Sequence, residues 1–174
     1  MSYPLTLLML CCSLTACGSD DDHEAAGVGG LGSCGVEARL SGGSSLHFTG
    51  DDDAACATQH SFESGLEVMF VGVSAEGSFE LQIADVMEGE TGADFKTRVI
   101  VVDAAHERFQ GNDCLTSVSE HRLLETEAST IGELRQYQVS GQGTCPSPLT
   151  PLNAELGEAA LGSFAFRAQF TWRD

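Results

Sequence analysis

The sequence predicts an all-β fold: a single antiparallel β-sandwich, jelly-roll or immunoglobulin-like, of about eight or nine strands. Three observations point to this class. Apolar side chains recur at every second position in several segments, which is the spacing of strands with one buried face. Turn-forming residues separate these segments at intervals common in antiparallel sandwiches. Helical periodicity is scarce, and only 104–109 and 153–161 are expected to form a helical turn or two.

The first predicted strands form a β-hairpin near the start of the domain. Apolar residues alternate from Val36 to Leu40 and resume at Leu46 and Phe48, after the glycine- and serine-rich segment 41–45. Two alternating runs separated by a short turn segment are typical of a hairpin.

A second hairpin is predicted where the apolar run 66–73 is followed by a turn-like segment at 75–77. Phe79, Leu81 and Ile83 then alternate with polar residues. The next apolar run, 98–103, is continuous and does not alternate with polar residues, which is typical of a strand buried on both faces or of one at the centre of a sandwich.

Two longer strands are predicted at 114–126 and 134–140, with a turn near Ser129 and Thr130. The glycine- and proline-containing segment 139–148 is then expected to leave the sheet at a bend.

The strand at the carboxyl terminus has the clearest pattern. Phe164, Phe166, Phe170 and Trp172 all fall at even spacing. A period of two places these rings on one face, whereas helical spacing would scatter them. Burying them contributes several kcal/mol at roughly 25 cal/mol per Å² of apolar area, so this face is predicted to be core.

Four cysteines lie within the predicted domain, and an even number in an exported chain favours two disulfides. Three connectivities are open, and we favour the local one, Cys34–Cys56 with Cys114–Cys145, because each pair flanks a predicted hairpin. If the strands at 114–126 and 134–140 were strictly symmetric about the turn near Ser129 and Thr130, Glu120 would lie opposite Val139, which is a poor cross-strand match. The hairpin is therefore better supported than its register. No two of these four cysteines have the close spacing of a zinc site.

The chain carries a formal net charge of -18, with 26 acidic residues against eight basic ones. Such a surface repels phosphate backbones and anionic headgroups, which disfavours nucleic-acid binding and adhesion through a basic patch. The simplest explanation of this charge is that it keeps the protein soluble on a crowded cell surface.

Calcium is the one cofactor candidate, and its candidate ligands are Asp51, Asp52 and Asp53, with His60 nearby. Calcium takes six to eight oxygen ligands, which clustered aspartates can supply. The spacing does not match an EF-hand, so a solvated acidic loop is the favoured interpretation.

No catalytic constellation is apparent, and the protein is predicted not to be an enzyme. The sequence has no strained Gly-x-Ser-x-Gly turn for a nucleophile. The histidines at 47, 60, 106 and 121 are scattered, and His47 and His121 are expected to point outward from strands. With 26 carboxylates, no one pair stands out for glycoside cleavage.

The amino terminus carries an apolar run, 5–14, which is too short to cross a bilayer and has the length of a signal-peptide core. Leu14, Thr15, Ala16 and Cys17 follow the Leu-small-small-Cys pattern and resemble the lipobox of bacterial lipoproteins. The resemblance implies that residues 1–16 are a leader and that Cys17 becomes acylated. An ordinary secretory leader is the alternative, and both export the chain.

Residues 17–33 are predicted to be a lipid-anchored, acidic and glycine-rich tether before the domain at 34–174. From Gly18 on, a random coil of this length would hold the domain roughly 20 to 25 Å from the lipid. Gly18 after the acylated cysteine is similar to outer-membrane lipoproteins of Gram-negative bacteria, so the resemblance implies the cell envelope and favours its outer membrane.

The sequence therefore predicts a lipid-anchored cell-envelope protein, a non-catalytic binding or structural module. Its expected partners are the membrane, through the lipid, and a protein or glycan outside the cytoplasm. The alternative is a calcium-assisted carbohydrate-binding or hydrolytic module, an analogy from fold class alone.

Overall fold

The structure is a computed structural model, and it describes residues 31–43, 46–49, 56–62, 65–71, 77–130 and 132–173. These residues contain ten strands and no helix. The strands are β1 (Gly35–Gly42), β2 (Leu46–Thr49), β3 (Cys56–Phe62), β4 (Gly65–Val71), β5 (Ser78–Ala84), β6 (Gly92–Val102), β7 (Arg108–Ser129), β8 (Gly132–Thr144), β9 (Thr150–Pro151) and β10 (Ala159–Arg173).

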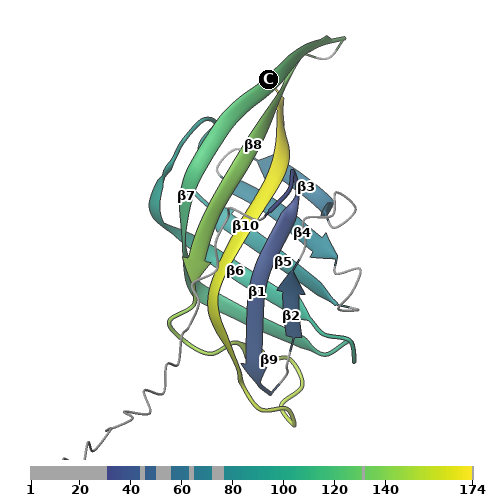
Figure 1. The fold of residues 1–174 in the computed structure, drawn as a ribbon, viewed down its shortest axis with the longest axis vertical. Coiled ribbons are helices and arrows are strands. Elements are labelled where there is room, and N and C mark those ends of the chain that lie inside the picture. Colours follow the sequence, from purple (N-terminus) through teal and green to yellow (C-terminus); the bar gives the residue numbers. More distant parts are fainter. Residues whose placement is uncertain are drawn as a thin grey trace, which may run out of the picture.

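All paired strands are antiparallel neighbours in one sheet, in the order β2-β1-β10-β8-β7-β6-β5-β4-β3 (Figure 1). The short β9 lies off this path and pairs with the start of β7. The all-β antiparallel prediction is thereby confirmed. A division into two separate sheets is not seen in the described strands, because each one is hydrogen-bonded to the next.

The sheet folds over so that its two halves enclose the core. In Figure 1, β1, β10 and β8 pass in front of β3 to β6, and β3 contacts β10 although the two are far apart in the strand order. Phe79 in β5 packs on Phe48 and on Phe164, with ring centroids 5.6 and 5.7 Å apart. The hydrophobic core therefore lies between the two halves of a single sheet.

The aromatic face predicted for the last strand is confirmed. Phe164, Phe166 and Phe170 in β10 are fully buried, and Trp172 packs against the same core at the strand end. Both predicted hairpins also form: Ala38 pairs with Phe48 between β1 and β2, and β4 pairs with β5 along its whole length.

The hairpin of β7 and β8 turns between Ser129 and Gly132, as predicted. The symmetric register holds from Leu115 to Val118, where Val118 pairs with Gly141, but not beyond it, because Glu120 pairs with Ser140 and His121 with Val139. A register shift after Val118 adds a residue to β7. It leaves His121 opposite the core residue Val139.

The two segments with weak helical signal, 104–109 and 153–161, form turns and strand ends. Two strands, β3 and β9, were not expected. Strand β3 has the sequence Cys-Ala-Thr-Gln-His-Ser-Phe, whose mixed polarity lacks a clear alternation.

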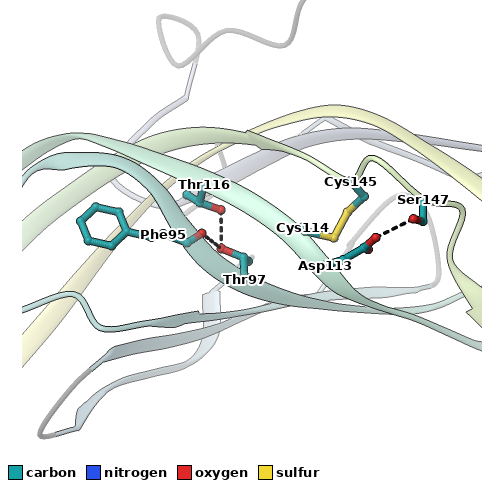
Figure 2. Close-up of a disulfide and its surroundings, with 7 residues drawn as sticks. All are labelled: Phe95, Thr97, Asp113, Cys114, Thr116, Cys145 and Ser147. Atoms are coloured by element: carbon teal, nitrogen blue, oxygen red, sulfur yellow. Dashed lines mark hydrogen bonds between the residues drawn. A yellow bond between two sulfur atoms is a disulfide. The ribbon is translucent and has the colours of Figure 1, made fainter.

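Both predicted disulfides are present. Cys34–Cys56 joins the residue before β1 to β3, and so links the two ends of the folded sheet. Cys114–Cys145 joins β7 to the residue after β8 (Figure 2). Beside it the Ser147 hydroxyl donates a 2.5 Å hydrogen bond to Asp113, which holds the chain where it leaves β8.

The last residues of the predicted tether lie against the sheet. Arg167 donates a hydrogen bond of 2.7 Å to the Leu31 carbonyl, and Gln138 donates one of 3.1 Å to that of Ser33. Leu31 is buried beside Ala165, apart from the main core. The sheet thus holds the chain from Leu31 onward, across the outer face of β8 and β10.

Candidate functional site

Several residues predicted to be functional lie outside the part of the chain that the structure describes. They are Leu14, Thr15, Ala16 and Cys17 of the lipobox, and Asp51, Asp52 and Asp53 of the calcium candidate. Within the described residues, no group of three or more His, Cys, Asp or Glu side chains is arranged to hold a metal ion.

Among the described residues, titratable and aromatic side chains gather where the β5–β6 turn meets β7 and β8, beside the end of β10. We call this group the His121 cluster. It consists of Glu88 and Glu90 from the turn, His121 from β7, Arg135 and Tyr137 from β8, and Trp172 from β10.

Strand register brings the aromatic members together. Tyr137 pairs with Phe170, and Arg135 with Trp172, across β8 and β10. The His121 ring lies 5.0 Å from Tyr137 and 4.8 Å from Trp172, and those two rings are 5.1 Å apart. Since Tyr137 and Trp172 pack on the core, His121 lies on the core side of the sheet. The sequence-based expectation of an outward histidine at this position is wrong.

Both ring nitrogens of His121 are engaged by the backbone of the β5–β6 turn. The Gly89 N–H donates to Nε2 at 3.2 Å, so Nε2 must be an acceptor without a proton. Nδ1 lies 2.9 Å from the Glu90 carbonyl and therefore carries the proton. Burial lowers the pKa of His121, against the opposing effects of the Glu90 carbonyl and the Glu88 and Glu90 carboxylates. The geometry specifies one neutral tautomer.

Arg135 and Glu88 form the charged part of the cluster. The Arg135 guanidinium donates two hydrogen bonds to the Glu88 carboxylate, of 2.6 and 3.0 Å, and a third of 3.1 Å to Glu133. The Arg135 side chain is 18% exposed and that of Glu88 29%, so this bidentate pair is partly shielded from solvent. Burial, followed by the Glu88 hydrogen bond, raises the pKa of Tyr137.

The arrangement fastens the β5–β6 turn to β7 and β8. His121, Arg135 and Tyr137 each have a polar partner within the cluster, and His121 has one at each nitrogen. A general base needs a lone pair directed at substrate, and a nucleophile needs a base beside it. The cluster is therefore suited to holding the β5–β6 turn against the sheet.

Sequence reasoning missed this cluster because its members come from four segments whose registers were unknown. The one available signal is that Arg135, Tyr137 and Val139 alternate along one strand, which puts Tyr137 on the side of the apolar Val139. Nothing local to His121 shows that a register shift places it on that same side.

Comparison with known proteins found no matching family model and no similar curated protein or solved structure. In the described residues, no helix is long and apolar enough to span a membrane.

Acidification is expected to weaken the His121 cluster. The fold favours neutral His121, so its contribution to stability is complete above the unfolded pKa of 6.5 and is lost as the pH falls through the lower folded pKa. A protonated Nε2 would also face the Gly89 N–H as a second donor. We expect the melting temperature of the wild type to fall between pH 7.5 and 5 by more than that of His121→Phe, which keeps a ring but cannot titrate.

The control for this measurement is His106→Asn, which replaces an exposed histidine at a positive φ of 62° with a residue that tolerates that conformation. It should retain the pH dependence of the wild type. Equal pH dependence in His121→Phe and the wild type would contradict the role given to His121.

Proposed function

We propose that the protein is an exported, lipid-anchored domain of the bacterial cell envelope that acts as a non-catalytic binding or structural module. The observation that carries the non-catalytic part of this proposal is the hydrogen bonding within the His121 cluster. Its catalytic-type side chains are bonded to one another and to backbone, so they support the fold.

The two disulfides support the export part of the proposal. Stable disulfides form in oxidising compartments, such as the periplasm and cell surfaces, and are rare in the cytosol. Cys34–Cys56 and Cys114–Cys145 close loops with sequence separations of 22 and 31 residues. These two disulfides can stabilise the fold only in a compartment that keeps them oxidised.

The contacts of Leu31 and Ser33 would limit how far the domain can stand from the proposed anchor. The lipobox resemblance makes Cys17 the attachment point, and the sheet holds the chain from Leu31. The residues between them could span at most about 50 Å when fully extended. The outer face of β8 and β10 would therefore stay within that reach of the lipid.

Replacing Cys17 with serine is expected to release the protein from the membrane. The serine variant offers no thiol to acylate, and two or three acyl chains are what would hold the protein firmly. The measurement is membrane fractionation combined with incorporation of labelled fatty acid, with nearly all of the wild type in the membrane fraction.

The matched control is Cys12→Ser, which removes a cysteine of the proposed leader. It should remain labelled and membrane-bound. A wild type that takes up no fatty acid would contradict the anchor and favour the ordinary secretory leader.

A further inference from the structure

The β7–β8 hairpin projects beyond the rest of the sheet. At the top of Figure 1 the paired ends of β7 and β8 extend past the other strands. Strand β6 pairs with β7 only as far along β7 as Val118, which lies opposite Gly92, the first residue of β6. Strand β8 pairs with β7 as far as Ser129. Beyond Val118, no described strand pairs with the β6 side of β7, so this edge of the hairpin is open.

The open edge has an irregular part and a regular part. Register shifts occur between Val118 and Glu120 and between Leu123 and Glu125. From Glu125 to Ser129, five consecutive residues keep an unbroken register with β8. A segment of this length matches an ordinary short strand, and its outward backbone groups can pair with an added strand.

The two charged residues of the regular part of this edge, 125–129, are both acidic. Glu125 and Glu127 are two residues apart, so their side chains lie on the same face of β7. Both are exposed, and neither side chain has a hydrogen-bond or ion-pair partner among the described residues. Glu120 differs, because Arg122 bonds it at 3.1 Å and lowers its pKa.

We propose that Glu125–Ser129 binds an extended cationic segment of another protein, added as a strand to the open edge of β7. Backbone hydrogen bonds to the edge would supply affinity, and alternate side chains would supply specificity. Lysines or arginines at alternate positions would face Glu125 and Glu127.

Electrostatics selects this partner over a second copy of the chain. Two β7 edges paired with each other would bring acidic residues together, and like charges on adjacent strands are destabilising. The net charge of -18 adds a general repulsion between copies. The acidic residues and the register shift near Leu124 also disfavour pairing of this edge with uncharged strands.

The test uses the protein as isolated from the cells that make it and a fluorescent decapeptide in which lysine alternates with valine and threonine. Fluorescence anisotropy measures binding, and hydrogen exchange maps it. We expect saturable binding and slowed exchange of the amides between Glu125 and Ser129. Glu125→Lys combined with Glu127→Lys should weaken binding about tenfold or more.

A charge-matched control variant combines Glu155→Lys with Glu158→Lys. These exposed residues follow β9, toward the opposite end of the molecule in Figure 1. This variant should bind the peptide as the wild type does. Equal weakening in the two double variants would show nonspecific attraction to an acidic protein and would overturn the proposal.

A second control alters the peptide, with N-methyl groups on alternate backbone amides and the same charges. It should fail to bind, because it cannot complete the strand pairing. Undiminished binding would overturn strand addition. A dimer in sedimentation with these β7 amides already protected would show that a second copy occupies the edge, and would overturn the proposal as well.

The inference names a partner for the module proposed above and rests on that proposal, but the two can fail separately. If the protein does not bind the peptide but Cys17→Ser still releases it from membranes, the strand-addition proposal is overturned and the proposed envelope function is unaffected.

Discussion

Replacing Gly143 with alanine is expected to cost about 3 kcal/mol of unfolding free energy, or about 10 °C in melting temperature. An added Cβ would lie 2.6 Å from the Leu115 carbonyl oxygen and 2.8 Å from Cε2 of the Phe164 ring. Strand β8 is hydrogen-bonded to β7 on one side and β10 on the other, so it cannot shift to make room. Chemical denaturation followed by circular dichroism measures the loss.

Gly162→Ala is the matched control, since it makes the same substitution in a strand with no heavy atom within 4 Å of the added Cβ. Its stability should equal or slightly exceed that of the wild type, because alanine reduces the entropy of the unfolded chain. Equal losses in the two variants would mean that strand glycines matter here for reasons other than close packing.

Replacing Cys114 and Cys145 together with alanine is expected to lower the unfolding free energy by about 3 to 4 kcal/mol. The disulfide closes a loop with a sequence separation of 31 residues, and Cys114 is fully buried in the core. Removing the bond therefore enlarges the unfolded ensemble and also takes sulfur from a packed site. Urea denaturation of the oxidised wild type and the variant measures the difference.

The wild type under a strong reductant supplies the control for that experiment. It should lose at least as much stability as the double variant, because the reductant breaks Cys34–Cys56 as well as Cys114–Cys145. A double variant within 0.5 kcal/mol of the oxidised wild type would contradict a stabilising role for Cys114–Cys145. Peptide mapping under non-reducing conditions gives an independent check of the connectivity.

Much of the fold was predictable because strands report their burial locally. The alternation of Phe164, Phe166 and Phe170 requires one buried face, whatever that face packs against. Cys114–Cys145 was predictable for a related reason, because the β7–β8 hairpin brings together the cysteines that flank it. Cys34–Cys56 has another cause, since Cys56 lies in β3 and the folding of the sheet brings β3 to the residue before β1. Strand β3 gave no such signal, because its sequence has no clear alternation of apolar and polar residues.

The candidate site was much less predictable. His121 lies beside Trp172 although the two are far apart in sequence, and they meet because β8 lies between their strands in the sheet. Whether His121 faced the core depended on one register shift, and moving the register by one residue reverses every side chain beyond it. Sequence alone specifies no such shift.

The sequence by itself determined the all-β class and most of the strands, the turn near Ser129, the acidic charge and the lipobox resemblance at Cys17, and it favoured the disulfide pairing that the structure shows. Each depends on residues close together in the chain or on composition. Only the tertiary structure decided that the strands form one folded sheet, that His121 fastens the β5–β6 turn, and that β7 ends in an open edge. These depend on which strands meet and in what register, and that choice is made by packing between segments distant in the chain.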